Sequence, residues 1–319
     1  MYLNNFKIKF LLYVAHMKGN KMKTSVVMAT YNGEKFLKQQ LDSILSQTVL
    51  PDELVIVDDC STDRTCEILS NYKKEYPSVN FELVLRDKNI GYIMNFIDGI
   101  NRSSHEYVFL CDQDDLWELN KIEKYLKFFE NSQKAIVIHG EIDIIDTEER
   151  QIRGPQYGYK ADCEYLDIKK FVRRVNYAGM SLAFKKSKIS DYLNLLVEQR
   201  IKIATHDWLI CYIAALQEGL YTTNNILTHR RYTGTNVALR LNQKRLSGIE
   251  YRIDGIDTYL VNYQMALACQ NLDILNSVFD ITPYIDTFEE RKIVLKNKSK
   301  IRSFLMIRKL MFFPSFKSY

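Results

Sequence analysis

Several signatures of common protein classes are missing from this 319-residue sequence. Its six cysteines include no C-x-x-C pair, which argues against a zinc site. No stretch approaches about 18 consecutive apolar residues, the length that a transmembrane helix requires. No internal repeat and no low-complexity tract occurs. No G-x-G-x-x-G follows the first expected strand, which disfavours a dehydrogenase.

What remains is the composition of a globular protein. Apolar residues make up 46% of the chain and charged residues 26%, and the length suits one α/β domain with an appendage. The net charge of +5 is too mild to indicate a nucleic-acid partner. Cysteines 111, 211 and 269 lie in apolar runs. We therefore expect buried free thiols in a reducing cytosol.

From Lys23 onward, short apolar runs alternate with segments of helical spacing. The pattern predicts strands at 25–28, 54–57, 81–85, 107–111 and 135–138. It predicts helices between them at 34–46, 64–76, 92–101 and 120–130. Such alternation is typical of a mostly parallel sheet with helices on both faces. Further on, we expect a polar loop at 147–166 of the kind that forms lids, a strand at 181–184 and a helix at 207–217.

The chain divides into three regions. We expect residues 1–21 to be an upstream extension without a role in the fold, and 22–240 to form the α/β domain. Residues 241–319 are mostly helical in pattern, and from Arg291 onward they hold nine Lys or Arg and no acidic residue. This basic tail predicts either docking on anionic lipids or a solvated helix packed on the main domain.

Polar clusters follow the first four expected strands. Because ligands bind beyond the carboxyl ends of parallel strands, we expect these clusters to meet at one edge of the sheet. The clusters are Thr30-Tyr31-Asn32, Asp58-Asp59, Arg86-Asp87 and Asp112-Gln113-Asp114-Asp115.

The last cluster predicts a cation site. Carboxylates packed this closely repel each other unless a cation lies between them, and a hard ion such as Mg²⁺ or Mn²⁺ suits their oxygens. Such an ion would also neutralise a leaving diphosphate. The alternative is a solvated acidic turn that caps the helix after it.

The second cluster offers a different chemistry. Asp58 or Asp59 could accept a hydrogen bond from a pyrimidine N3–H or from ribose hydroxyls. The residues that follow, Ser61-Thr62-Asp63, make a good helix N-cap.

Two later segments carry candidate catalytic and binding groups. Asp207 is predicted to be either a helix cap with a depressed pKa or the general base for an acceptor hydroxyl. Trp208 beside it would form an apolar wall or part of the core. The segment His229-Arg230-Arg231 would hold a diphosphate, or would form a solvated basic strand.

Together these strings resemble the family 2 glycosyltransferases, which share the GT-A fold. The matching strings, spread over about residues 22–236, are Val26–Gly33, Val55–Asp63, Asn89-Ile-Gly91 and Asp112–Trp117. The pattern Asp-Gln-Asp-Asp-x-Trp, with His206-Asp-Trp208 later, resembles the rhamnosyltransferase-like branch that builds bacterial surface polysaccharides. The resemblance implies a GT-A domain with a helical C-terminal extension.

The resemblance also implies roles for individual residues. The implied donor-binding residues are Thr30, Tyr31, Asn32, Asp58, Asp59, Asp87, Asn89, Asp112, Gln113, Arg230 and Arg231. The implied acceptor-binding residues are Gly179, Met180, Ser181, His206 and Trp208. Asp207 is implied as the catalytic base. The implied ligands of Mg²⁺ or Mn²⁺ are Asp114, Asp112 and His229.

One string departs from the family pattern. Related sequences often carry Tyr-Arg-x-His, in which the histidine binds the metal, whereas this chain has His229-Arg-Arg-Tyr232. We expect either that His229 substitutes for it or that Asp114, the diphosphate and water complete the coordination.

The reaction that follows is a single displacement with inversion at the anomeric carbon. The resemblance favours dTDP-L-rhamnose as donor, followed by UDP-hexoses or UDP-N-acetylhexosamines. We expect a glycan or lipid-linked saccharide as acceptor and a cytoplasmic location. Docking of the basic tail on anionic lipids would place the reaction at the inner face of the plasma membrane. Two alternatives from other classes are a nucleotidyltransferase, disfavoured because no Gly-rich basic loop follows the first strand, and a catalytically inactive nucleotide-sugar-binding module.

Overall fold

A computed structural model describes residues 22–234, 248–271 and 279–296. The predicted extension at 1–21 and residues 297–319 of the basic tail lie outside these ranges. The central element of the protein is one sheet of the order β3-β2-β1-β4-β9-β6-β10-β5, with β7 paired to β6 and β8 paired to β10.

The first half of the sheet is parallel and follows the predicted alternation. Its strands are β1 (Thr24–Thr30), β2 (Glu53–Asp58), β3 (Asn80–Leu85) and β4 (Tyr107–Cys111). The helices that connect them are α2 (Leu37–Leu45), α3 (Thr65–Glu75) and α4 (Tyr92–Arg102). Every residue of β2 is buried, because helices cover both faces of a parallel sheet.

The second half is mixed in direction. Its strands are β5 (Leu116–Trp117), β6 (Val137–Ile145), β7 (Gln151–Arg153), β8 (Glu164–Tyr165), β9 (Leu182–Lys185) and β10 (Leu220–Arg231). Strand β9 runs antiparallel to both β4 and β6, and it joins the two halves. Strand β10 is parallel to β6, with two register shifts near Ile226. These irregularities remove the regular alternation by which a strand is recognised in a sequence.

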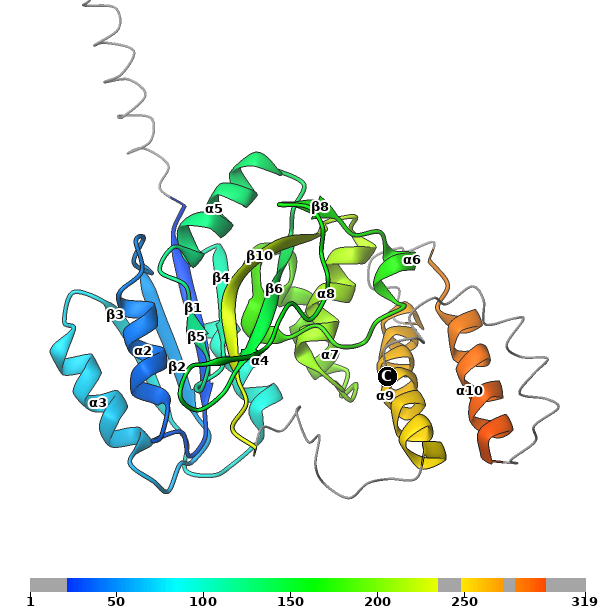
Figure 1. Cartoon of the computed structure of the whole chain (residues 1–319), viewed down its shortest axis with the longest axis horizontal. Helices are drawn as coiled ribbons and strands as arrows, with labels where there is room; N and C mark the ends of the chain where they lie inside the picture. Colours follow the sequence, from blue (N-terminus) through cyan, green and yellow to red (C-terminus); the bar gives the residue numbers. More distant parts are fainter. Residues whose placement is uncertain (1–21, 235–247, 272–278, 297–319) are drawn as a thin grey trace, which may run out of the picture.

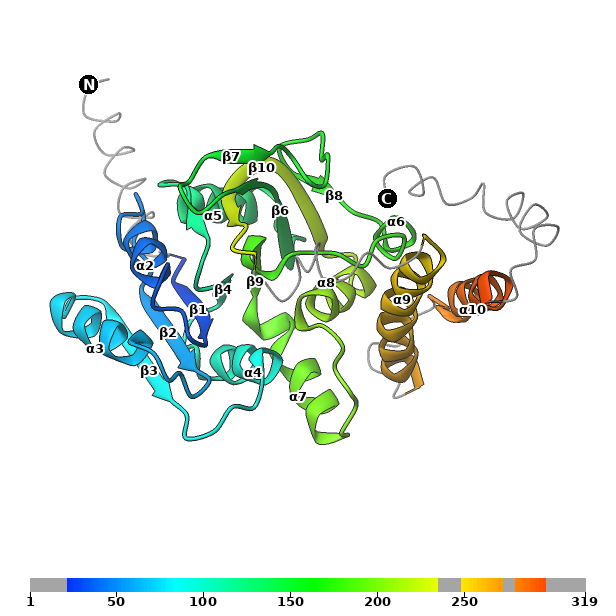
Figure 2. The same cartoon turned by 60° about the horizontal axis from the view of Figure 1, so that its bottom comes forward.

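The helices cover the two faces of the sheet in two groups (Figures 1 and 2). Helices α2, α3 and α5 (Lys121–Asn131) share one buried apolar cluster with one face. Helices α4, α7 (Ser190–Glu198) and α8 (His206–Leu216) share a second cluster with the other face. The remaining helical pieces are α6 (Ile168–Phe171), η1 (Gly179–Ser181) and η2 (Lys186–Lys188).

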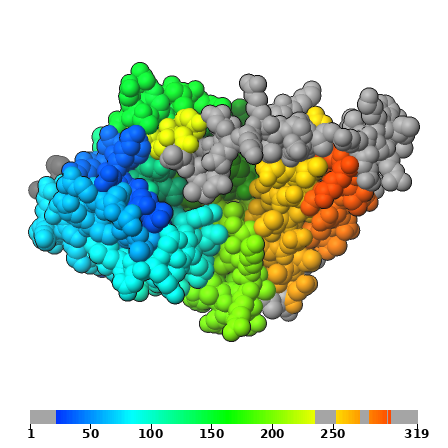
Figure 3. Space-filling view, turned by 90° about the horizontal axis from the view of Figure 1, so that it is seen from below, coloured from blue at the N-terminus to red at the C-terminus, as the bar shows by residue number. Residues whose placement is uncertain are grey.

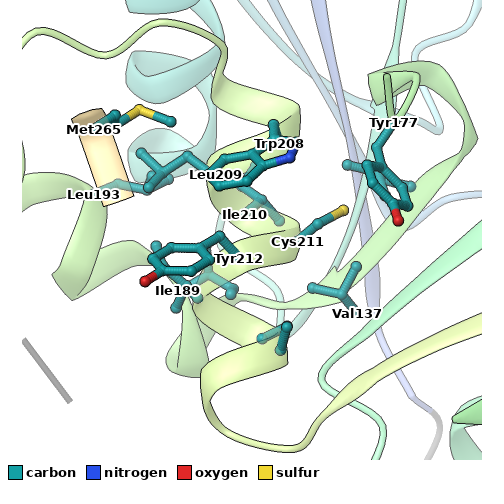
Figure 4. Packing of buried hydrophobic residues seen from close by; sticks show 14 of the residues in the cluster. Val137, Tyr177, Ile189, Leu193, Trp208, Leu209, Ile210, Cys211, Tyr212 and Met265 are labelled. Atoms are coloured by element: carbon teal, nitrogen blue, oxygen red, sulfur yellow. The ribbon is translucent and has the colours of Figure 1, made fainter. Parts of the chain in front are cut away.

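The C-terminal helices α9 (Gly248–Asn271) and α10 (Thr282–Lys296) lie at the end of the molecule opposite α2 and α3 (Figure 3). Tyr263 of α9 belongs to the same buried cluster as Trp208 and Tyr212 of α8, whose packing Figure 4 shows from close by. The predicted helical C-terminal region is therefore confirmed for its described part, and α9 is packed on the main domain. Within the three described ranges, no helix combines the length and apolar character needed to cross a membrane.

The predicted loop at 147–166 differs from expectation. It contains β7 and β8, and its middle part is tied to β6 by hydrogen bonds from 156–159 to the Glu141 carboxylate. This segment is therefore anchored to the sheet in the structure.

Candidate active site

The ends of β1 and β2 are joined by Asp58, whose side chain is fully buried. Its Oδ2 accepts hydrogen bonds from the hydroxyls of Thr30 (2.7 Å) and Ser61 (2.6 Å), and its Oδ1 accepts one from the Ser61 backbone N–H (2.8 Å). A buried carboxylate with this many donors is stabilised where it stands. Asp58 therefore fixes the loops that border the predicted nucleotide pocket.

Asp59 organises the neighbouring loop. Its two carboxylate oxygens accept the backbone N–H groups of Ile90 (2.8 Å) and Gly91 (2.9 Å), just before α4. Gly91 has φ +90°, which glycine adopts without strain. Asp87 and Asn89 lie exposed on this loop. Contact of Asp58 or Asp59 with a pyrimidine stays a prediction, and the structure assigns both side chains a scaffolding role.

The loop after β1 is held against the acidic turn by Gln113. Its side-chain amide donates to the Tyr31 carbonyl (3.0 Å) and accepts the Tyr31 N–H (2.8 Å). A Cβ on Gly33 would come within 2.3 Å of Gln113 Oε1, so a larger residue here would displace the Gln113 side chain. Asn32 has φ +48° and accepts the N–H of Thr62 on its Oδ1 (2.8 Å). The predicted nucleotide pocket is thus built from loops that contact one another.

The acidic turn after β4 brings three carboxylates together. Burial and, next, the charge of the neighbouring Asp112 together raise the pKa of Asp114 to about 6. Burial also raises the pKa of Asp112, while the charge of Arg230 opposes the rise. Asp115 is 1% exposed, and burial raises its pKa well above the usual range. Its Oδ1 accepts the Arg231 N–H (3.0 Å).

Arg231 has a structural role, which corrects its predicted contact with a diphosphate. Its side chain is fully buried, with Nε donating to the Asp114 carbonyl (3.0 Å) and Nη1 to the Asp146 carbonyl (3.2 Å). The guanidinium also lies over the ring of Phe36, 4.7 Å from its centroid. Arg231 therefore holds the acidic turn to β10. Arg230 is the arginine whose charge lowers the pKa of Asp112.

Asp207 is the second residue of α8, in the first turn, and Thr205 occupies the N-cap. Its Oδ1 accepts the N–H of Trp208 (2.7 Å). Burial raises the pKa of Asp207 to about 6, while that hydrogen bond and the charge of Arg230 oppose the rise. The predicted alternative of a cap with a depressed pKa is therefore wrong. A carboxylate with a pKa near neutrality is suited to accept a proton.

The predicted acceptor residues divide into two sets. A Cβ on Gly179 would lie 3.5 Å from the Asp207 Cβ and 3.3 Å from His206 Nε2, so Gly179 does border the site. Trp208 is fully buried and stacks on Tyr212, with ring centroids 5.1 Å apart. Its predicted contact with an acceptor is corrected to a place in the core.

The other three predicted acceptor residues are buried as well. Met180 and Ser181 are 1% and 0% exposed. His206 stacks on Phe96 at 4.3 Å, and burial lowers its pKa to about 4. Neither ring nitrogen of His206 has a hydrogen-bond partner among the described residues. His206 is thus a neutral side chain between the core and Gly179.

His229 has partners that compete with its predicted metal role. Its Nδ1 lies 2.7 Å from Asp143 Oδ1 and its Nε2 lies 2.9 Å from Glu118 Oε1. The hydrogen bond with Asp143 raises its pKa. Both ring nitrogens contact carboxylates. We therefore assign His229 a role in joining β10 to β6, in place of the predicted role as a metal ligand.

The acidic turn fits a hard cation in part. Asp112 and Asp114 offer half-buried oxygens, and Asp115 Oδ2 has no hydrogen-bond partner within the described ranges. No group of three His, Cys, Asp or Glu side chains in the described parts of the chain is arranged to enclose a metal. These residues suit Mg²⁺ or Mn²⁺ only with further oxygens from a diphosphate and water.

Three residues at the site had not been predicted. Lys121 is fully buried and donates to the Met180 carbonyl (2.6 Å) and to Thr228 Oγ1 (2.7 Å). The Tyr157 hydroxyl contacts the backbone of Ala178, next to Gly179, and Glu141 accepts the backbone N–H of Tyr157. Glu141 lies among the apolar residues of β6, and a charged residue in such a strand is the signal that the sequence offered.

Several known proteins are similar to this chain in sequence. A relative from Nostoc sp. described as an uncharacterized glycosyltransferase is 30% identical over 254 residues, covering 75% of this chain and 76% of the relative. A dTDP-rhamnosyl transferase from Shigella flexneri, RfbG, is 26% identical and covers 69% and 78%. The mycobacterial relatives are 35% identical over 123 residues, so the chain spans about a third of the length of those curated relatives.

Solved structures show the same fold. S. aureus TarS 1–349 in complex with UDP-GlcNAc has a TM-score of 0.58 and 20% identity, and the match covers 86% of this chain and 72% of TarS. A mannosyltransferase from Pyrobaculum calidifontis, in complex with GDP-Man and Mn²⁺, has a TM-score of 0.50 and 15% identity, with 86% and 69% covered. The predicted GT-A fold is thereby confirmed.

The model of a protein family matches residues 25–193, which contain both β1 and the acidic turn. Its description is glycosyl transferase family 2. With the Nostoc relative aligned over three quarters of its own length, the assignment extends past Asp207 and the described site. This chain belongs to glycosyl transferase family 2.

Proposed function

We propose that this protein is an inverting glycosyltransferase that takes a sugar from a nucleoside-diphosphate sugar in the presence of Mg²⁺ or Mn²⁺. The supporting observation is that Arg230 acts on two carboxyl groups, Asp207 and Asp112 of the acidic turn, and its charge lowers the pKa of each. Burial nevertheless raises the pKa of Asp207 to about 6. A base and a diphosphate-binding group are what the reaction requires on opposite sides of an anomeric carbon.

The proposed step is a single displacement. The acceptor hydroxyl attacks the anomeric carbon, its proton passes to the Asp207 carboxylate, and the bond from that carbon to the diphosphate oxygen breaks. Arg230 stabilises the charge of the departing diphosphate. Asp112 and Asp114 would hold the cation, which neutralises the same charge when bound. One carboxylate base without a carboxylate nucleophile gives inversion.

The favoured donor is dTDP-L-rhamnose. The support comes from the Asp-Gln-Asp-Asp-x-Trp string and from the Shigella dTDP-rhamnosyl transferase, which is similar over 69% of this chain. UDP-hexoses and UDP-N-acetylhexosamines are the second candidates, since TarS shares the fold and is described with UDP-GlcNAc. We propose a glycan or lipid-linked saccharide as acceptor, used in surface-polysaccharide synthesis at the inner face of the plasma membrane.

A donor screen tests the proposal. The full chain is incubated with Mn²⁺ and, in separate reactions, dTDP-L-rhamnose, UDP-glucose, UDP-GlcNAc or GDP-mannose, and the release of nucleoside diphosphate is measured without acceptor. We expect slow hydrolysis of dTDP-L-rhamnose above the others, and loss of that hydrolysis with EDTA. Binding of a donor without hydrolysis, at any metal concentration, would favour the inactive sugar-binding module instead.

A further inference from the structure

A buried carboxylate organises a loop near the acceptor side of the site. Glu141, in the middle of β6, is 2% exposed. Its Oε1 accepts the backbone N–H groups of Gln156 (2.8 Å) and Tyr157 (2.7 Å), and its Oε2 accepts those of Gly158 (2.6 Å) and Tyr159 (3.1 Å). Gly158 has φ +69°, a conformation that helps successive N–H groups converge on one anion.

The loop places the Tyr157 hydroxyl against the turn that borders Asp207. This hydroxyl accepts the backbone N–H of Ala178 at 2.9 Å. Ala178 directly precedes the η1 turn, where a Cβ on Gly179 would lie 3.5 Å from the Asp207 Cβ. The hydroxyl therefore fixes the backbone at the point where it approaches the proposed base.

A second set of contacts leads from Tyr157 to α8. The Arg174 guanidinium lies 5.1 Å from the centroid of the Tyr157 ring and donates to the Tyr157 carbonyl (3.3 Å). The Arg174 carbonyl in turn accepts the indole N–H of Trp208 at 3.2 Å. Burial raises the pKa of the Tyr157 hydroxyl, and the charges of Arg230 and Asp207 also act on it. Tyr157 thus lies within electrostatic reach of both groups.

We propose that Tyr157 is a positioning residue for the transfer step, whose hydroxyl holds the 178–181 turn against Asp207 while Glu141 fixes the loop that carries it. Tyr157 would act through Gly179 and Asp207, without a bond to the reacting atoms. This inference rests on the proposed function for its kinetic consequences, whereas its structural part concerns the free protein.

Tyr159 provides a matched control within the same loop. Its ring stacks on that of Tyr157, with centroids 5.4 Å apart and planes at 12°. Its hydroxyl bonds to the His139 Nδ1 side-chain atom at 2.9 Å, whereas the Tyr157 hydroxyl bonds to the backbone N–H of Ala178. Tyr157→Phe and Tyr159→Phe each remove one hydroxyl and one hydrogen bond from the same stack, so they differ in which partner is released.

The experiment has two readouts on the full chain. The first readout is hydrogen–deuterium exchange at the backbone amides of 178–181 in the free protein. Tyr157→Phe should accelerate this exchange by about tenfold, because one hydrogen bond is lost. Tyr159→Phe should leave the exchange unchanged. The second readout is the rate of dTDP-L-rhamnose hydrolysis in the presence of Mn²⁺. Here Tyr157→Phe should lower kcat by about tenfold and leave the donor KM within about twofold, since the loops of the donor pocket are untouched.

The two readouts separate failure of this inference from failure of the proposed function. If the wild type hydrolyses none of the tested nucleotide sugars, the proposed function fails and exchange at 178–181 still decides the structural part. Unchanged exchange in Tyr157→Phe would overturn the inference. Faster exchange with an unchanged kcat would overturn the positioning role, as would an equal effect of Tyr159→Phe on kcat.

Discussion

The two sides of the site are both held by buried carboxylates, but these carboxylates occupy different places in the sheet. On the donor side, Asp58 and Asp59 stand where β2 ends and accept hydrogen bonds from the neighbouring loops. On the acceptor side, Glu141 stands in the middle of β6 and holds a loop 15 to 18 residues further along the chain. The proposed donor pocket is therefore formed by the sheet edge itself, whereas the proposed acceptor side depends on one loop that is hydrogen-bonded to the sheet.

The two sides should therefore respond differently to substitutions. The donor loops contact one another through Gln113, Thr62 and Asp59, so a change in one loop disturbs the others. The acceptor loop is held mainly by Glu141 and by the Tyr157 hydroxyl, and substitutions there should alter transfer without altering donor binding.

The largest expected effect comes from Asp207→Asn, which should separate the two sides most clearly. The amide cannot accept a proton at neutral pH, so we expect turnover to fall by about 10³-fold. Donor affinity, measured by calorimetry with the donor from the screen, should stay within about twofold because the donor loops are unchanged. Asp191→Asn, in the first turn of α7, is the matched control and should keep wild-type turnover. Near-wild-type turnover of Asp207→Asn would remove it from the role of base.

The next effect concerns the acidic turn and tests which residues hold the metal. Asp114→Asn removes one hard oxygen charge, and we expect turnover to fall by about a hundredfold, with partial recovery at high Mn²⁺. The affinity for Mn²⁺ in the presence of nucleoside diphosphate, measured by electron paramagnetic resonance, should fall in parallel.

His229→Gln provides the contrast to Asp114→Asn. Both ring nitrogens of His229 already contact carboxylates, at Asp143 and Glu118, so Mn²⁺ affinity should be unchanged by the substitution. A loss of Mn²⁺ affinity equal to that of Asp114→Asn would restore His229 as a ligand.

A smaller effect should distinguish the two carboxylate anchors. Asp59→Asn and Glu141→Gln each present an amide N–H₂ to backbone N–H groups, so we expect each to lower the free energy of unfolding by about 2 to 3 kcal/mol. Unfolding by urea titration measures this change in the free energy of unfolding. Asp59→Asn should also raise the donor KM, whereas Glu141→Gln should lower kcat. The comparison fails if both variants change the same kinetic parameter.

The sequence predicted the parallel half of the sheet well because its signals are local. Strands β1 to β4 alternate with helices at regular spacing, and the clusters after them meet at the edge that the topology requires. Asp112 and Asp114 lie there, with Asp58 and Asp59 beside them. What the sequence did not show is burial, which makes Asp58 and Arg231 parts of the scaffold.

The second half of the sheet and the contacts around Asp207 were predicted poorly because the residues that meet there are distant in sequence. Strand β10 carries two register shifts, so its residues lack regular alternation, and it was expected only as a short basic segment. Glu141 and Tyr157 meet through backbone N–H groups, which leave no pattern in the side chains. Trp208 was placed next to the acceptor because of its neighbour Asp207, although successive residues in a helix point in different directions.

The smallest expected effect is the pH dependence of turnover, which sharpens the role of Arg230 between the two sides. Burial raises the pKa of Asp207 to about 6, and the base acts only when deprotonated, so turnover should be constant above that pH and fall about tenfold per unit below it. The charge of Arg230 lowers the pKa of Asp207, so Arg230→Gln should move the midpoint to higher pH. Arg64→Gln, whose side chain is 70% exposed in its pair with Glu67, should leave the midpoint in place. Saturating Mn²⁺ keeps Asp114 deprotonated during the measurement.

A midpoint that moves downward in Arg230→Gln, or that moves equally in Arg64→Gln, would contradict direct action of Arg230 on the base. An upward shift confined to Arg230→Gln would mean that one guanidinium couples the group that leaves on the donor side to the group that accepts the proton on the acceptor side.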